Sequence, residues 1–181
     1  MGSSSITHAN STTTARDISF LWQALSELAL TELHVGHAGA SALGAALGRG
    51  ALPRLTRLFL GGTEISDAGL VALAPALRRL PALDHLVLWG NPFGDEGLAA
   101  LVAPPPPAGA LPPPTGVLTK LKMLYLRSTQ ITDAGCAALT AALDSGALSA
   151  LETLVLGGTL ASAAAHAKVV EALATSRAMP T

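Results

Sequence analysis

Leucines recur along the chain in the pattern Leu-x-x-Leu-x-Leu, and polar and small residues follow most copies at fixed offsets. The clearest copy runs from Leu55 to Leu60, and the residues that follow it in this way are Thr63, Ile65, Asp67, Gly69 and Leu73. Further copies begin at Leu30, Leu83, Leu121 and Leu151. Successive copies that begin at Leu55 and Leu83 are 28 residues apart. A repeat of this length is typical of a solenoid, in which each unit packs on its neighbours and the array presents an extended binding surface.

The alternation inside each copy predicts a short strand. Side chains of a strand point alternately to opposite faces, so the clearest copy buries Leu58 and Leu60 and exposes Arg57 and Phe59. The same alignment places the first strand at residues 31–35. Each unit would therefore contribute one strand to a sheet that has one buried face and one exposed face.

A helix is predicted after the strand in each of the middle units. Asp67, Asp95 and Asp133 stand where the polar turn gives way to alanine and leucine, and an acidic residue is favoured in the first turn of a helix. Ser66 is predicted to cap the helix that begins at Asp67. Pro75 falls inside this helix and is expected to kink or split it, because it removes a backbone hydrogen bond.

The pattern also divides the chain into segments. They are a disordered leader at residues 1–16, an N-terminal capping helix at residues 17–29, a repeat domain at residues 30–174 that ends in a helix, and a tail at residues 175–181. The capping helix is predicted from the helical spacing of Ile18, Leu21 and Leu25. Alternatively, this helix is the second half of a repeat that begins upstream.

A proline-rich stretch at residues 104–116 lengthens the third unit. Its composition predicts polyproline II or loop structure, as an insertion between a helix and the next strand. The Pro-x-x-Pro spacing between Pro104 and Pro114 could dock an SH3 or WW domain. The nearest basic residue is Lys120, so an inert insertion is favoured over a docking motif.

Composition narrows the class of protein. Half of the 181 residues are hydrophobic but only 3% are aromatic, so the core must consist largely of leucine, alanine and valine. The net charge is −1 with no long run of either sign, which argues against a nucleic-acid or membrane-surface binder. A single cysteine cannot form an internal disulfide, and the first residues lack the features of a signal peptide. We therefore expect a cytoplasmic protein.

The repeat Leu-x-x-Leu-x-Leu-x-x-Asn/Thr resembles the leucine-rich repeat, and Ile131-Thr-Asp-Ala-Gly135-Cys136-Ala-Ala-Leu139 resembles its ribonuclease-inhibitor-like subclass. That subclass includes the repeat domains of NOD-like receptors and of the Ran GTPase-activating protein. The resemblance covers residues 30–173. It implies an α/β leucine-rich repeat solenoid of about five repeats, with a parallel concave sheet, convex helices and a polar ladder at Asn91 and its threonine counterparts.

The exposed strand positions form the candidate binding site. They lie side by side on one face, together with Glu32 and His34 from the first strand as aligned here. The residues predicted to bind a partner are Arg57, Phe59, His85, Val87, Trp89, Met123, Tyr125, Arg127 and Val155. An apolar and aromatic patch edged by arginine is typical of the centre of a protein interface.

No constellation of residues predicts a metal site, a cofactor or catalysis. His34 and His85 are expected about 10 Å apart, with one strand between them, which is too far for shared ligation. The repeated aspartates occupy a structural offset rather than a unique pocket. The preferred function is a non-catalytic module that binds a protein or peptide. Two alternatives stay open: a GTPase regulator of the Ran GTPase-activating type, and a fragment of a NOD-like receptor.

Overall fold

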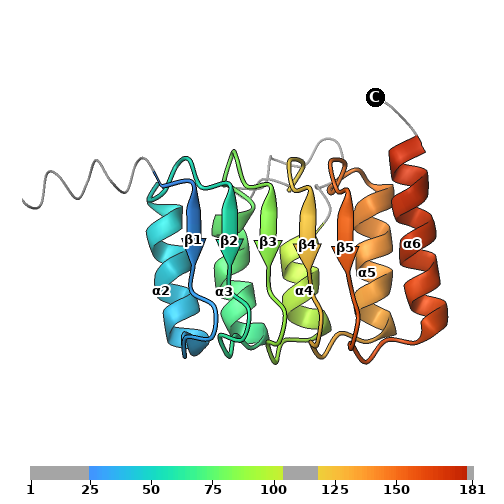
Figure 1. Ribbon diagram of the computed structural model, residues 1–181, viewed down its shortest axis with the longest axis horizontal. Coiled ribbons are helices and arrows are strands. Elements are labelled where there is room, and N and C mark those ends of the chain that lie inside the picture. Colours follow the sequence, from blue (N-terminus) through green and yellow to red (C-terminus); the bar gives the residue numbers. More distant parts are fainter. Residues whose placement is uncertain (1–24, 104–117, 179–181) are drawn as a thin grey trace, which may run out of the picture.

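The computed structural model describes residues 25–103 and 118–178, in which five strands alternate with five helices (Figure 1). The strands are β1 (Glu27–Ala29), β2 (Arg57–Phe59), β3 (His85–Val87), β4 (Met123–Tyr125) and β5 (Thr153–Val155). The helices are α2 (Gly36–Gly48), α3 (Asp67–Leu77), α4 (Asp95–Val102), α5 (Asp133–Asp144) and α6 (Ala163–Ala178). Each strand and the helix that follows it form one coil.

The strands form a single parallel sheet in sequence order, and the helices lie together on one side of it (Figure 1). Leu58 pairs with Leu86, and Leu86 pairs with Leu124, so equivalent positions of successive coils stand next to each other. The predicted α/β solenoid of about five repeats is confirmed. The predicted strand residues of the second to fifth units are confirmed as well.

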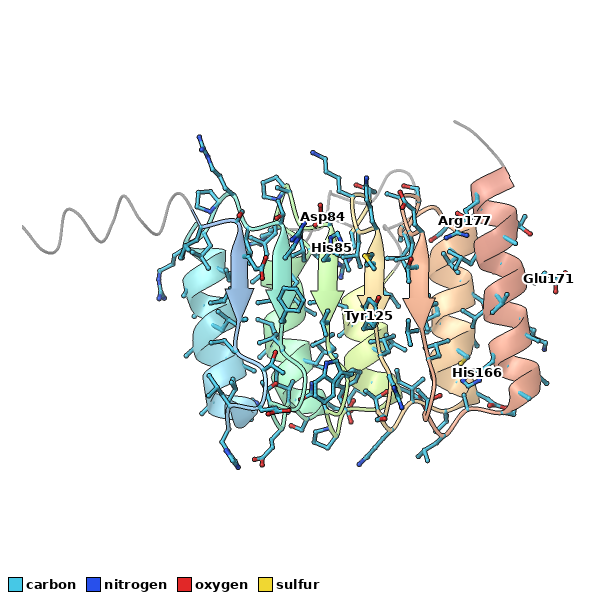
Figure 2. The ribbon with its side chains drawn as sticks, viewed as in Figure 1. Asp84, His85, Tyr125, His166, Glu171 and Arg177 are labelled. Atoms are coloured by element: carbon cyan, nitrogen blue, oxygen red, sulfur yellow. The ribbon has the colours of Figure 1, made fainter. Side chains whose placement is uncertain are left out.

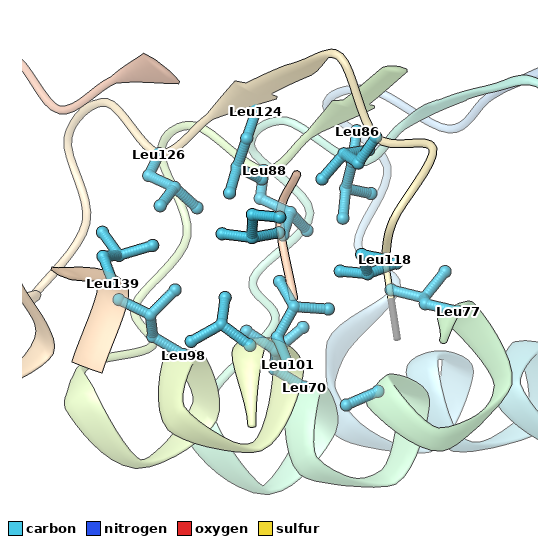
Figure 3. Packing of buried hydrophobic residues seen from close by; sticks show 14 of the residues in the cluster. Leu70, Leu77, Leu86, Leu88, Leu98, Leu101, Leu118, Leu124, Leu126 and Leu139 are labelled. Atoms are coloured by element: carbon cyan, nitrogen blue, oxygen red, sulfur yellow. The ribbon is translucent and has the colours of Figure 1, made fainter. Parts of the chain in front are cut away.

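The core lies between the sheet and the helices. Strand-side leucines such as Leu88 and Leu126 are fully buried and face Leu98, Leu101 and Leu139 from the helices (Figure 3). The buried cluster is made almost entirely of leucine, alanine, valine and isoleucine, with Phe93 as its one large aromatic side chain among the described residues. Leucine rows in adjacent coils therefore form one continuous core.

Asn91 ties the second and third coils together at the turn that follows the strand. Its amide nitrogen donates to the carbonyl oxygens of Leu60 at 2.7 Å and Leu88 at 2.9 Å. Its Oδ1 accepts from the backbone N–H groups of Thr63 at 3.1 Å and Ile65 at 3.0 Å. Asn91, which is only 2% exposed, thus satisfies backbone groups of two coils. The Thr63 and Thr129 hydroxyls each donate to a carbonyl of their own coil at 2.8 Å, whereas the Thr159 hydroxyl bonds His166 instead, so the predicted ladder is confirmed except at Thr159.

The three recurrent aspartates, Asp67, Asp95 and Asp133, begin helices as predicted, but each carboxylate caps the helix of the next coil. Asp67 Oδ1 accepts from the backbone N–H groups of Gly94 at 2.9 Å and Gly97 at 2.7 Å, at the start of α4. We call these residues the aspartate relay. Capping by Ser66 is a wrong prediction, because its side chain makes no capping hydrogen bond.

The other two members of the relay repeat this arrangement. Asp95 Oδ1 accepts from the N–H groups of Thr132 at 2.8 Å and Gly135 at 2.9 Å, and Oδ2 accepts from the Thr132 hydroxyl at 2.6 Å. Asp133 accepts from the N–H of Ser162 at 2.6 Å and from its hydroxyl at 2.9 Å. These bonds from Ser162 hold the pKa of Asp133 below its ordinary value. The relay stops at α6, where Ala163 takes the aspartate position.

The first coil begins earlier than the sequence pattern predicted. Residues 27–29 form β1, where a capping helix was expected, and residues 31–35 form a turn instead of a strand. The reason is that residues 25–30, Leu-Ser-Glu-Leu-Ala-Leu, also satisfy the repeat, and Leu28 pairs with Leu58. In this register Val35 and Gly39 stand at the positions of Ile65 and Gly69.

Two helices also differ from expectation. Helix α3 continues through Pro75 without a split and ends two residues later, so proline removes only a bond of the last turn. Helix α6 runs to Ala178, beyond the end predicted at residue 174. The predicted leader, residues 17–24 of the predicted capping helix and the proline-rich insertion lie outside the described residues. Within the described ranges, no helix is long and apolar enough to cross a membrane.

Candidate protein-binding face

The sheet face opposite the helices carries all nine predicted binding residues. The pairing of β2 to β5 aligns Arg57, His85 and Met123 in one row and Phe59, Val87, Tyr125 and Val155 in a second. A third row follows the strands: the N–H of Gly62 donates to the carbonyl of Trp89, and that of Gly90 to the carbonyl of Arg127, each at 2.8 Å. All nine are exposed or half-buried. We call this surface the open face.

The first coil contributes other residues to the open face than expected. Glu27 and Ala29 pair with Arg57 and Phe59, in the places assigned to Glu32 and His34 from sequence. His34 instead lies in the turn that precedes α2, where its Nε2 is 3.2 Å from the Glu64 carboxylate. The error follows from the placement of the first strand, and it removes His34 from the candidate site.

Arg57 and His85 on the open face each lie beside a carboxylate. A guanidinium nitrogen of Arg57 is 3.5 Å from the Glu27 carboxylate. His85 Nδ1 is 2.6 Å from Asp84 Oδ1 at the start of β3, as Figure 2 shows, with Tyr125 lower on the same face. Both pairs belong to the row of Arg57, His85 and Met123. The positive charge of Arg57 is therefore partly balanced within the protein.

The open face is hollowed around Tyr125, between Trp89 and Val155. Five residues line a hollow of about 510 Å³: Trp89, Tyr125, Arg127, Ser128 and Val155. Four of them were predicted, whereas Ser128 was missed. A signal existed, since Ser128 takes the turn position that is left-handed in other coils, with φ of 56° at Ser128, 64° at Gly62 and 67° at Gly90. Glu32 takes the same position in the first coil with φ of 60°, so a side chain stands at this turn in two of the coils.

Trp89 lies flat on the backbone of the second coil. A Cβ added to Gly61 would overlap the indole ring at Cε2, Nε1 and Cδ1, and one added to Gly62 would lie 3.7 Å from Cζ3. Position 61 therefore has room only for glycine, because the indole ring occupies the space that a side chain would need. This contact turns the indole toward the second coil and leaves the hollow open beside it.

Gly61→Ala is expected to lift the Trp89 ring from its seat and lower the free energy of unfolding by about 1–3 kcal/mol. Tryptophan emission, measured in a Trp22→Phe background, should shift to longer wavelength as the ring meets water. Gly157→Ala is the matched control, because a Cβ there meets no atom within 4 Å. Unchanged emission in Gly61→Ala would contradict the described seat of the ring.

In residues 25–103 and 118–178, the side chains that could hold a metal ion lie apart, and the single thiol is buried. No group of three or more histidine, cysteine, aspartate or glutamate side chains there is placed to hold a metal ion. Cys136 is buried in α5, and burial, followed by the carboxylates of Asp133 and Asp95, raises the pKa of its thiol. A raised pKa disfavours the nucleophilic thiolate. The open face offers apolar area and hydrogen bonds, which are means of binding.

Coil geometry and core together define an α/β leucine-rich repeat solenoid of about five repeats. Comparison with known proteins agrees: the family described as Leucine Rich repeat matches residues 52–74, 81–102 and 117–139. These matches cover most of the second, third and fourth coils. No curated protein matches the chain.

One solved structure shares this architecture at low sequence identity, and a second matches it more weakly. One, titled "Leiomodin-1 Actin-Binding Site 2 (ABS2)", has a TM-score of 0.64 and 12% identity, and the match covers 89% of this chain and 86% of that one. Another is an internalin (inlF) from Listeria monocytogenes str. 4b F2365, with a TM-score of 0.38, 18% identity, and coverage of 65% of this chain and 33% of that one. At such identity the leiomodin likeness speaks for the fold alone.

Proposed function

We propose that the protein is a non-catalytic interaction module that binds a protein or peptide on its open face. One observation carries this proposal: Phe59, Trp89 and Tyr125 gather on one face of the sheet, and every described helix lies on the other side (Figure 1). Exposed aromatic and apolar patches of this kind mark interaction sites, and tryptophan, tyrosine and arginine dominate interface energies.

The fold supports the proposal without naming a partner. Leucine-rich repeat solenoids present extended surfaces, and the similar leiomodin structure is titled as an actin-binding site. A place in the ribonuclease-inhibitor-like subclass and a cytoplasmic location are further parts of the proposal. Nothing in the described residues favours the GTPase-activating alternative, and an assay of GTP turnover with and without the protein would test it.

The test uses peptides displayed on phage and selected on the intact protein. Trp89→Ala combined with Tyr125→Ala is expected to weaken the selected peptides at least about tenfold, because both side chains are proposed anchors. Circular dichroism should show a folded protein that melts cooperatively at a somewhat lower temperature than the parent, since Trp89 loses its contact with Gly61 but neither ring belongs to the buried core. Val71→Ala is the control, as Val71 is an exposed apolar residue on helix α3. Equal binding by the double variant and the parent would reject the open face as the binding surface.

A further inference from the structure

The hollow of the open face contains two exposed hydrogen-bond donors that have no partner in the part of the chain that the structure describes. Among the described residues, neither the Arg127 guanidinium nor the Ser128 hydroxyl makes a hydrogen bond or an ion pair. Arg57 on the same face is paired with Glu27, and Lys122 nearby is 3.8 Å from the Glu152 carboxylate. The positive charge available on this face is therefore concentrated at Arg127.

Both donors stand on backbone that is held on two sides. The carbonyl of Arg127 accepts from Gly90 at 2.8 Å, and the N–H of Ser128 donates to the carbonyl of Gly157 at 2.9 Å. The left-handed conformation of Ser128 fixes the turn between these bonds. The backbone that carries both donors is therefore fixed in place, while the exposed Arg127 side chain keeps its rotamer freedom until a ligand binds.

Apolar side chains form the rest of the hollow. Tyr125 and Val155 are register partners in β4 and β5, and Trp89 is seated on Gly61 at the other side. A volume of about 510 Å³ falls within the range of roughly 300–1,000 Å³ seen for ligand sites. The hollow thus joins an apolar wall to a pair of donors.

We propose that this hollow binds a peptide segment in which an aspartate or glutamate adjoins an aliphatic or aromatic residue. The carboxylate accepts from Arg127 and Ser128, and the apolar neighbour packs on Trp89, Tyr125 and Val155. Arginine matches a carboxylate with two parallel hydrogen bonds. A phosphopeptide fits less well, because phosphate recognition uses clusters of arginine and the hollow has one. This inference rests on the proposed function and adds the chemistry of its ligand.

The experiment starts from the same phage selection, with random peptides on the intact protein. Peptides preferred by the parent over the Trp89→Ala and Tyr125→Ala double variant are expected to share an acidic residue beside an apolar one. One such peptide and its Asp→Asn or Glu→Gln counterpart are then titrated against the parent, Arg127→Gln, Ser128→Ala and Arg177→Gln. The Arg177 variant is the matched control, because that arginine is exposed in the last turn of α6 and lies outside the open face.

The parent should bind the acidic peptide at least about tenfold more tightly than the amide peptide. Arg127→Gln should lose this preference, Ser128→Ala should reduce it, and Arg177→Gln should keep it. Selected peptides without an acidic residue, or an acidic preference that survives Arg127→Gln, would overturn the inference and leave the proposed function standing. Failure to select any peptide over the double variant would overturn both.

Discussion

Leu88→Ala lowers the free energy of unfolding by about 2–5 kcal/mol, because it empties a fully buried position in the middle of the array. Leu88 is flanked by Leu60 in the preceding coil and Leu126 in the next, and α4 covers it from the helix side (Figure 3). Two neighbouring coils lose packing together with its own, so the damage extends along the solenoid. Urea unfolding followed by circular dichroism measures the loss.

The matched control for this variant is Val87→Ala, one residue earlier on the same strand. Val87 is half-buried on the open face, so its truncation should cost less than about 1 kcal/mol. A difference this large between adjacent aliphatic residues tests the alternation directly. If Val87→Ala were the more damaging change, the two faces of the sheet would have to be exchanged and the proposed binding face abandoned.

Asp95→Ala should cost about 2–3 kcal/mol, because it removes the acceptor of three hydrogen bonds at the start of α5. The N–H groups of Thr132 and Gly135 would lose their partner in a crowded junction between helices. Asp95→Asn keeps one acceptor oxygen and should lose less than the alanine variant. Thermal unfolding by calorimetry compares the two.

Asp144→Ala serves as the control for Asp95→Ala. Asp144 is exposed at the last residue of α5, and among the described residues it makes no hydrogen bond or ion pair. A carboxylate at the end of a helix is also unfavourable to its dipole, so removal should be neutral or slightly stabilising. Similar losses in both variants would show that the relay does not stabilise the array.

The strands could be predicted where one alignment of the leucines was possible. Around Leu58, Leu86, Leu124 and Leu154 only one copy of the pattern fits, and the predicted strand residues are confirmed. At the start of the chain two overlapping copies compete, at residues 25–30 and 30–35, and the helical spacing of nearby leucines favoured the wrong one. In the correct copy, Val35 and Gly39 stand at the repeat positions of Ile65 and Gly69. This match distinguishes residues 25–30 from residues 30–35 as the first copy.

The contacts between coils could not be predicted in the same way. The sequence marks Asp67 as the start of a helix, but it gives no sign that the carboxylate reaches Gly94 and Gly97 in another coil. The hollow was also beyond prediction, since it depends on which way Trp89 turns. Alternation identifies the face on which a side chain lies, whereas the shape of that face depends on side-chain directions that only the assembled coils determine.

The aspartate relay runs in one direction, and this makes the two ends of the solenoid unequal under truncation. Each carboxylate serves a helix one coil later, so removing α6 and then α5 leaves α4 with its cap intact. Removing the second coil, by contrast, takes Asp67 away and leaves the first turn of α4 uncapped. During synthesis the N-terminal coils emerge first, so α4, α5 and α6 each meet a carboxylate that is already in place. The direction of the aspartate relay therefore matches the order in which the coils are synthesised.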